Sequence, residues 1–116
     1  MKKVLLFGFD ALPEIMAAVS AVQRFGGEAV TVPRSDWGLT LDALACGQHG
    51  SSSAPTGGKM LVVCGMDAEL DGLLAALRQA GITCPKAVLT PSNRGWTAGR
   101  LYRELERERR AMGGTR

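Results

Sequence analysis

The chain has 116 residues, of which 46% are hydrophobic and 22% charged, and its formal net charge is +3. This length suits a single domain spanning residues 1–116, and the hydrophobic fraction suffices for a packed core and excludes a disordered chain. No apolar run approaches the ~20 residues of a membrane span and the start MKKVLLFGF is too short for a signal peptide, so we expect a cytoplasmic protein without a membrane partner.

The basic charge is concentrated at the C-terminal end. Residues 94–116 hold seven Arg and three Glu, whereas the rest of the chain is near −1. Glu104 precedes Arg107, and Glu106 precedes Arg109, by three positions, which is typical of a solvated helix face. Nucleic-acid binding favours a basic stripe without interleaved acids, so a nucleic-acid partner is not expected.

The first half begins with a nearly continuous apolar strand at residues 4–9. Gly8-Phe9-Asp10 follows, and we expect Asp10 to cap a helix that ends at Gly26 or Gly27. The sheet-facing stripe of this helix is predicted from its spacing to be Leu12, Ile15, Met16, Val19 and Val22. A second strand at residues 28–32 and a short helix at about residues 39–46 complete this half.

Residues 47–58 read GQHGSSSAPTGG, the composition of a flexible linker. The second half then repeats the order of the first. A strand at residues 60–66 is followed by Asp67 as a helix cap, a helix ending at Gly81, and a strand at residues 86–90. The stripe of that helix is predicted to be Leu70, Leu73, Leu74 and Leu77.

The last helix is expected at about residues 95–111, with Asn93 as its N-cap. Its predicted inner face consists of Trp96, Leu101, Tyr102 and Leu105. A Trp therefore follows the second strand of each half, at positions 37 and 96. Residues 4–44 and 61–105 together read as an internal duplication of one βαβ unit.

Two architectures fit a βαβ unit used twice. The first is a ferredoxin-like (α+β) sandwich, in which the two apolar strands lie in the middle of an antiparallel sheet and the extra helices or a partner subunit cover the second face. The alternative is a four-stranded parallel doubly wound sheet of strand order 2-1-3-4. The soft linker between the halves favours the ferredoxin-like fold, because no crossover helix is needed there.

The chemistry-bearing residues are sparse. Cys46, Cys64 and Cys84 show no Cys-x-x-Cys spacing and read as buried free thiols, and His49 reads as a solvated loop residue. An aspartate in each Gly-x-Asp sequence would repel a phosphate, so we expect helix capping there. We predict no cofactor, no metal site and no catalytic residues, because the chain shows no nucleophile–base pattern.

The turns that precede the last helix of each half differ between the halves. Pro33-Arg34-Ser35-Asp36-Trp37 contains an acid, whereas residues 90–96 do not and open a helix. A helix N-terminus with an arginine and hydroxyl or amide groups can hold a carboxylate or phosphate. The tentative ligand-binding residues are Thr90, Ser92, Asn93, Arg94 and Trp96, and the expected ligand is a small anion.

The second half resembles a known family, domain of unknown function 3783, over roughly residues 60–108. The resemblance rests most on the string Lys86-Ala87-Val88-Leu89-Thr90-Pro91-Ser92-Asn93 with Trp96. It also rests on Gly65, on Gly81-Ile82, and on the leucine-bearing helix, Leu101 and Glu104-Leu105. The resemblance implies family membership and no particular activity, and the first half lacks the string.

Three functions remain open from the residues alone. The first is a non-enzymatic regulatory or small-ligand-binding module, which could assemble as a homo-oligomer. The second is a protein–protein interaction domain that uses the C-terminal helix. The third is an enzyme built on a parallel sheet, with a cleft at the C-terminal ends of both apolar strands.

Overall fold

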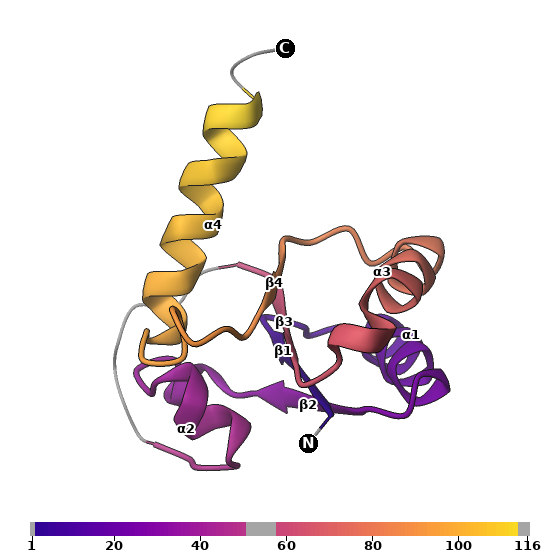
Figure 1. The fold of residues 1–116 in the computed structure, drawn as a ribbon, viewed down its shortest axis with the longest axis horizontal. Helices are drawn as coiled ribbons and strands as arrows, with labels where there is room; N and C mark the ends of the chain where they lie inside the picture. Colours follow the sequence, from indigo (N-terminus) through magenta and orange to yellow (C-terminus); the bar gives the residue numbers. More distant parts are fainter. Residues whose placement is uncertain (1, 51–57, 114–116) are drawn as a thin grey trace.

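A computed structural model describes residues 2–50 and 58–113 of the chain, whose strands form one four-stranded sheet (Figure 1). The strands are β1 (Lys3–Phe7), β2 (Glu28–Val32), β3 (Met60–Cys64) and β4 (Lys86–Val88), in the order β2-β1-β3-β4. The two apolar strands β1 and β3 are central, as predicted. Strands buried on both faces carry almost continuous apolar sequence, and that is the pattern found here.

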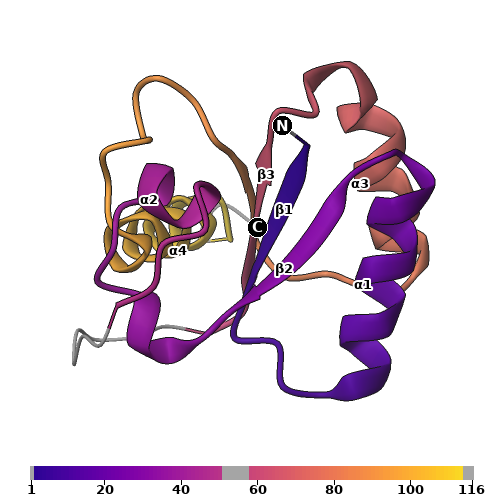
Figure 2. The same cartoon turned by 90° about the horizontal axis from the view of Figure 1, so that it is seen from below.

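Helices cover both faces of the sheet, so the molecule has three layers (Figure 2). Helices α1 (Leu12–Arg24) and α3 (Leu70–Gln79) lie on one face, and α2 (Leu41–Ala45) and α4 (Ala98–Gly113) lie on the other. Short 3₁₀ helices at Arg34–Asp36 and Asp67–Glu69 precede α2 and α3. Within the described ranges, no helix is long and apolar enough to span a bilayer.

The strand directions agree fully with neither predicted architecture. β1 pairs with β2, and β3 with β4, in parallel, whereas the central pair β1–β3 is antiparallel. The strand order of the parallel alternative is confirmed, but its direction for β3 is wrong. The ferredoxin-like sandwich is right for the antiparallel pair β1–β3 but wrong for the outer pairs, because in that fold β1 would pair with β4 and β3 with β2, both antiparallel.

The connections explain this mixed sheet. Each βαβ crossover returns the chain to the end of the sheet where it began, so the two strands that it joins are parallel. No crossover joins β2 to β3. Met60 therefore starts β3 at the end of the sheet where β1 finishes, opposite Phe7, and the second unit is inverted relative to the first.

The two faces of the sheet carry separate hydrophobic clusters. Leu73 and Leu77 of α3 are fully buried against one face and Leu70 packs beside them, which confirms the predicted stripe except for the partly buried Leu74. The stripe of α1 is partly wrong, because Leu12 and Met16 are 65% and 61% exposed. The smaller side chains of this helix face the sheet instead, and its buried residues are Ala18, Ala21 and Val22.

The predicted aspartate caps are wrong. Helix α1 begins after Ala11, with no capping side chain and with a proline in its first turn, whose missing N–H leaves fewer donors to satisfy. Asp10 remains exposed. Asp67 lies in the 3₁₀ turn before α3, which also has no side-chain cap. Gly26 and Gly81 end the two helices in left-handed conformations, with φ of 80° and 86°, as predicted for C-terminal glycines.

Hydrogen bonds around the starts of α2 and α4 repeat between the two halves at an offset of 57 residues (97 − 40), whereas those at the ends of α1 and α3, from Gly27 to Val22 and from Ile82 to Leu77, repeat at 55. Thr40 Oγ1 accepts the N–H of Ala43, and Thr97 Oγ1 accepts the N–H of Arg100, both at 3.2 Å. The two threonines therefore occupy the N-cap positions of α2 and α4. Asn93, the predicted cap of the last helix, lies four residues too early, and this prediction is wrong.

The same offset corrects the pairing of the tryptophans. The N–H of Leu39 bonds to the carbonyl of Asp36 at 3.0 Å, and the N–H of Trp96 bonds to the carbonyl of Asn93 at 2.9 Å. Trp96 is thus the counterpart of Leu39. The counterpart of Trp37 is Arg94 (37 + 57), an exposed residue in place of a fully buried indole.

Candidate functional site

The turn of residues 90–97 lies where the two halves meet on the face covered by α2 and α4. Thr40 and Thr97 form an isolated antiparallel bridge there. The N–H of Leu41 bonds to the carbonyl of Trp96 at 2.9 Å, and the N–H of Ala98 bonds to the carbonyl of Leu39 at 3.4 Å. The turn is therefore tied to its counterpart by reciprocal backbone hydrogen bonds.

Asn93 closes the outer edge of β4. Its Nδ2 donates to the carbonyl of Val88 at 3.0 Å, and its Oδ1 accepts the N–H of Thr90 at 2.8 Å. One side-chain amide thus supplies a donor and an acceptor to the end of an edge strand, as a neighbouring strand would. Such protection prevents an edge from pairing with another chain.

The other predicted site residues also have partners within the protein. Arg94 Nη2 donates to Asp42 Oδ1 at 2.8 Å, and this hydrogen bond and the Asp42 charge raise the pKa of Arg94. The Thr90 hydroxyl accepts the N–H of Asn93 at 3.3 Å. The Trp96 ring stacks against the Arg100 guanidinium, whose central carbon is 4.2 Å from the ring centroid.

The structure therefore brings Thr90, Asn93 and Arg94 together with Trp96 as parts of one folded turn, and leaves Ser92 exposed beside them. The contacts of these residues explain the shape of the turn. Binding of an anion at Thr90, Ser92, Asn93, Arg94 and Trp96 stays a prediction.

The counterpart of Asn93 in the first half is Asp36, a carboxylate that is only 2% exposed. It accepts the N–H of Gly50 at 2.8 Å and lies 3.0 Å from His49 Nδ1. The Gly50 hydrogen bond, with a contribution from His49, lowers the pKa of Asp36 against the effect of burial. This carboxylate anchors the start of the segment predicted as a linker, of which residues 51–57 lie outside the described residues.

The thiols differ in exposure. Cys46 is exposed, Cys84 is half-buried and Cys64 is buried, so the prediction of three buried thiols is wrong for Cys46. Burial raises the pKa of Cys64 to about 11 and also raises that of Cys84. Across residues 2–50 and 58–113, no three His, Cys, Asp or Glu side chains gather in a way that could hold a metal ion.

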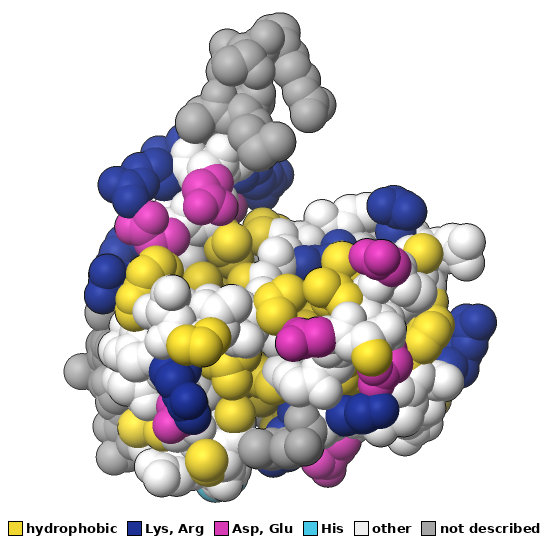
Figure 3. Space-filling model, in the orientation of Figure 1, with side chains coloured by type: hydrophobic (Ala, Val, Ile, Leu, Met, Phe, Trp, Pro, Cys, Tyr) yellow, Lys and Arg dark blue, Asp and Glu magenta, His cyan; other side chains and the backbone are white. Residues whose placement is uncertain are grey.

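The C-terminal helix extends beyond the rest of the molecule. Within residues 98–110, whose side chains are described, the apolar residues that pack on the sheet lie in the first two turns, where Leu101 is buried and Tyr102 and Leu105 are partly buried. Together with the partly buried Trp96 just before the helix, they confirm the predicted inner face. Helix α4 then continues past the body (Figure 1). Figure 3 shows dark blue and magenta side chains gathered on this projecting part.

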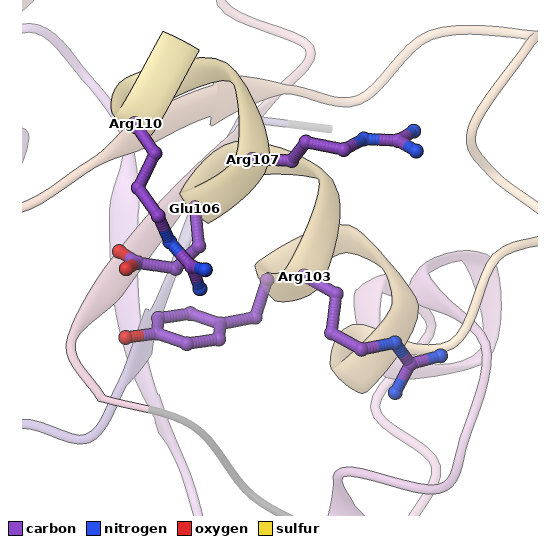
Figure 4. Close-up of a pocket in the computed structure, with 5 residues that line it drawn as sticks. Arg103, Glu106, Arg107 and Arg110 are labelled. Carbon is purple, nitrogen blue, oxygen red and sulfur yellow. The ribbon is translucent and has the colours of Figure 1, made fainter. Parts of the chain in front are cut away.

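A shallow cavity of about 350 Å³ lies along α4. Its lining residues are Tyr102, Arg103, Glu106, Arg107 and Arg110. In Figure 4, Arg103 and Arg107 extend to one side of the helix and Glu106 extends to the other. The predicted charge pairs are present: Arg107 Nη2 is 2.6 Å from Glu104 Oε1, and Arg109 Nη1 is 3.2 Å from Glu106 Oε1.

The sequence prediction of site residues missed this cavity. The available signal was that the apolar spacing of α4 stops at Leu105 while the helical charge pairing continues. A helix that is polar all round either lies free in solvent, stabilised by such pairs, or meets a partner. The position of the cavity beside Tyr102 depends on how α4 leaves the sheet, which no local pattern specifies.

Residues 59–112 match a family model described as Domain of unknown function (DUF3783). The match confirms the family resemblance, which was predicted over roughly residues 60–108. The matched segment runs from the residue before β3 almost to the end of α4 and so covers the second βαβ unit and the helix after it. Neither the curated proteins nor the solved structures contain a match to the chain.

Proposed function

We propose that this protein is a non-enzymatic interaction module that binds an acidic segment of a partner protein along the projecting part of α4. One observation carries the proposal: among the residues of α4 whose side chains are described, none after Leu105 belongs to the apolar cluster on the sheet, whereas the helix continues to Gly113. An isolated helical segment of this length is marginal in water and is stabilised chiefly by packing of one face. A partner on α4 would supply that packing.

The charges of the cavity favour an acidic partner. Three of its five lining residues are arginines and one is a glutamate. Among the described residues, Arg103 and Arg110 have no ion-pair partner, so their guanidinium groups are free to bind carboxylates. The half-buried Tyr102 adds an aromatic surface beside them, and Tyr and Arg are typical anchors of protein interfaces.

The opposite directions of β1 and β3 argue against an enzyme with a cleft at the C-terminal ends of these two strands. Such an enzyme needs the C-terminal ends of β1 and β3 at one edge of the sheet. Because β1 and β3 are antiparallel, Asp10 and Asp67 follow them at opposite ends, and no cleft can include both strand ends. We also infer that the two halves arose by duplication, which the repeated hydrogen bonds support.

Fluorescence polarisation with a short labelled peptide of Glu, Ala and Leu, designed as an acidic helix, tests the proposal. We expect the intact protein to bind, and the variant R103Q/R107Q/R110Q to bind about tenfold more weakly or worse, because it loses the guanidinium groups of Arg103 and Arg110 and the positive charge of Arg107 beside them.

The matched control is R24Q/R34Q/R78Q, which removes the same charge from the rest of the surface and should bind like the intact protein. Equal affinities for the two triple variants would contradict a site on α4. Circular dichroism verifies that both variants keep the helix content of the intact protein.

A further inference from the structure

The two halves of the chain meet through an interface in which equivalent residues face each other. Leu5 lies directly opposite Val62, its counterpart at the offset of 57 residues (62 − 5). Thr40 is bridged to Thr97, its own counterpart (97 − 40). One two-fold axis therefore passes between both pairs, through the centre of the sheet and through the junction of the two turns.

The other contacts obey the same axis. Lys3 lies opposite Cys64, and Phe7 lies opposite Met60, so the first residue of each central strand faces the last residue of the other. The hydrogen bonds from Leu41 to Trp96 and from Ala98 to Leu39 form a reciprocal pair. This exchange of positions is the property of an isologous interface, in which one patch binds a second copy of itself.

The interface includes part of the buried core between the sheet and the helices α2 and α4. The apolar side chains of β1 and β3 on the face of α2 and α4 belong to one buried cluster, which includes Leu5, Phe7, Met60 and Val62. A unit that lost its partner would expose this cluster and the open edge of its central strand. Such an edge pairs readily with another strand.

We propose that the unit of residues 59–112 is a self-pairing module, and that residues 3–45 are its covalently attached partner. The surface now covered by the first half fits a second copy of the 59–112 unit. The extent of the family match, which covers this unit alone, supports the same division. The inference concerns a different surface from the proposed partner site on α4 and stands independently of it.

Two contacts break the symmetry and favour the internal partner. The buried Trp37 packs edge-on against Tyr102 of the second half, with 5.9 Å between the ring centroids, and a pair of 59–112 units would place Arg94 there instead. Arg94 binds Asp42 of the first half, with 58% and 46% of the two side chains exposed. The counterpart of Asp42 is Gly99 (42 + 57), so in a pair of 59–112 units each Arg94 would face a glycine. An aspartate at position 99 would restore the ion pair on both sides of the axis.

The experiment uses the complete protein with a protease site placed within residues 51–57 and then cleaved, so that both fragments are present. After unfolding and refolding, native mass spectrometry should show the paired fragments together with a homodimer of the C-terminal fragment. In G99D the homodimer fraction should rise about threefold or more, and G99D/R94Q should remove that gain.

A disulfide cross-link between two copies of the C-terminal fragment supplies a second measurement. In a C46S/C84S background, T97C should form a disulfide-linked homodimer of the C-terminal fragment, because Thr97 would lie opposite its own copy. The control Q79C, at the end of α3 and away from the axis, should not be cross-linked. The proposal would be overturned if no homodimer formed in either the cleaved protein or its G99D variant. Equal cross-linking through positions 79 and 97 would also overturn it.

Discussion

At the scale of single residues, Asn93 shows that a polar turn residue before a helix need not cap that helix. Polar turn residues before a helix are good N-cap candidates, and this reasoning led to Asn93 as the cap of α4. The structure assigns the cap to Thr97 and uses the Asn93 amide to close the edge of β4 at Val88 and Thr90. Asn93 thus belongs to the sheet more than to the helix.

Replacing Asn93 with alanine should lower the free energy of unfolding by about 1–2 kcal/mol, because two hydrogen bonds to the backbone of an edge strand are lost. Urea denaturation measures the change. The neighbouring substitution S92A is the control: Ser92 is exposed, and its loss should change stability by less than about 0.5 kcal/mol. An N93A variant as stable as S92A would contradict the edge-closing role.

The residue types around the turn were predictable from the sequence, but their partners were not. Arg94 was recognised as a charged residue near a helix start, yet Asp42, its partner, is 52 residues away. The equivalence of Leu39 with Trp96 was hidden because two tryptophans of similar spacing suggested a simpler alignment. Pairings between distant segments depend on how the units are oriented, which no local spacing contains.

At the scale of elements, the connection between β1 and α1 shows how closely the two halves approach each other. Gly8 adopts a left-handed conformation with φ of 75°. A Cβ atom built there would lie 2.8 Å from the carbonyl oxygen of Gly58, which comes just before β3. Gly81, at the end of α3, has a similar φ of 86° but open space around it.

These two glycines form a matched pair for a stability measurement. G81A should cost about 1 kcal/mol, from the strain of a left-handed residue alone. G8A should cost at least about 1 kcal/mol more, because the backbone at Gly58 must also move. Thermal or urea unfolding of both variants tests this difference, and equal losses of stability would show that the close approach of the two segments is absent.

The elements themselves followed well from the sequence. Residues 28–32 form β2 as predicted, and the strands expected at 60–66 and 86–90 are present in shorter form. Periodicity was less informative for α1, because apolar residues occur on more than one side of it and the smaller ones face the sheet. Which side of such a helix is buried is decided by the fit of small side chains to the sheet.

At the scale of the whole molecule, the main finding is that two similar units face each other in opposite directions within one sheet. The central place of β1 and β3 could be predicted from their continuous apolar sequence, but which edge strand lies beside each of them could not. Strand direction could not be predicted either, because the apolar pattern of a buried strand is the same in parallel and antiparallel sheets. The long connection after β2 leaves either direction possible for β3.

The antiparallel pairing of β1 with β3 is the basis of the two-fold relation between the halves, and a disulfide cross-link tests it most directly. Lys3 lies opposite Cys64, and residues opposite each other in an antiparallel pair have side chains on the same face at short distance. In a C46S/C84S background, K3C should therefore form an intramolecular disulfide with Cys64 on mild oxidation, detected by peptide mass spectrometry. In a parallel arrangement of the two units, Cys64 would instead lie beside Phe7, so a folded K3C variant without this disulfide, and a cross-link from F7C to Cys64, would contradict the account.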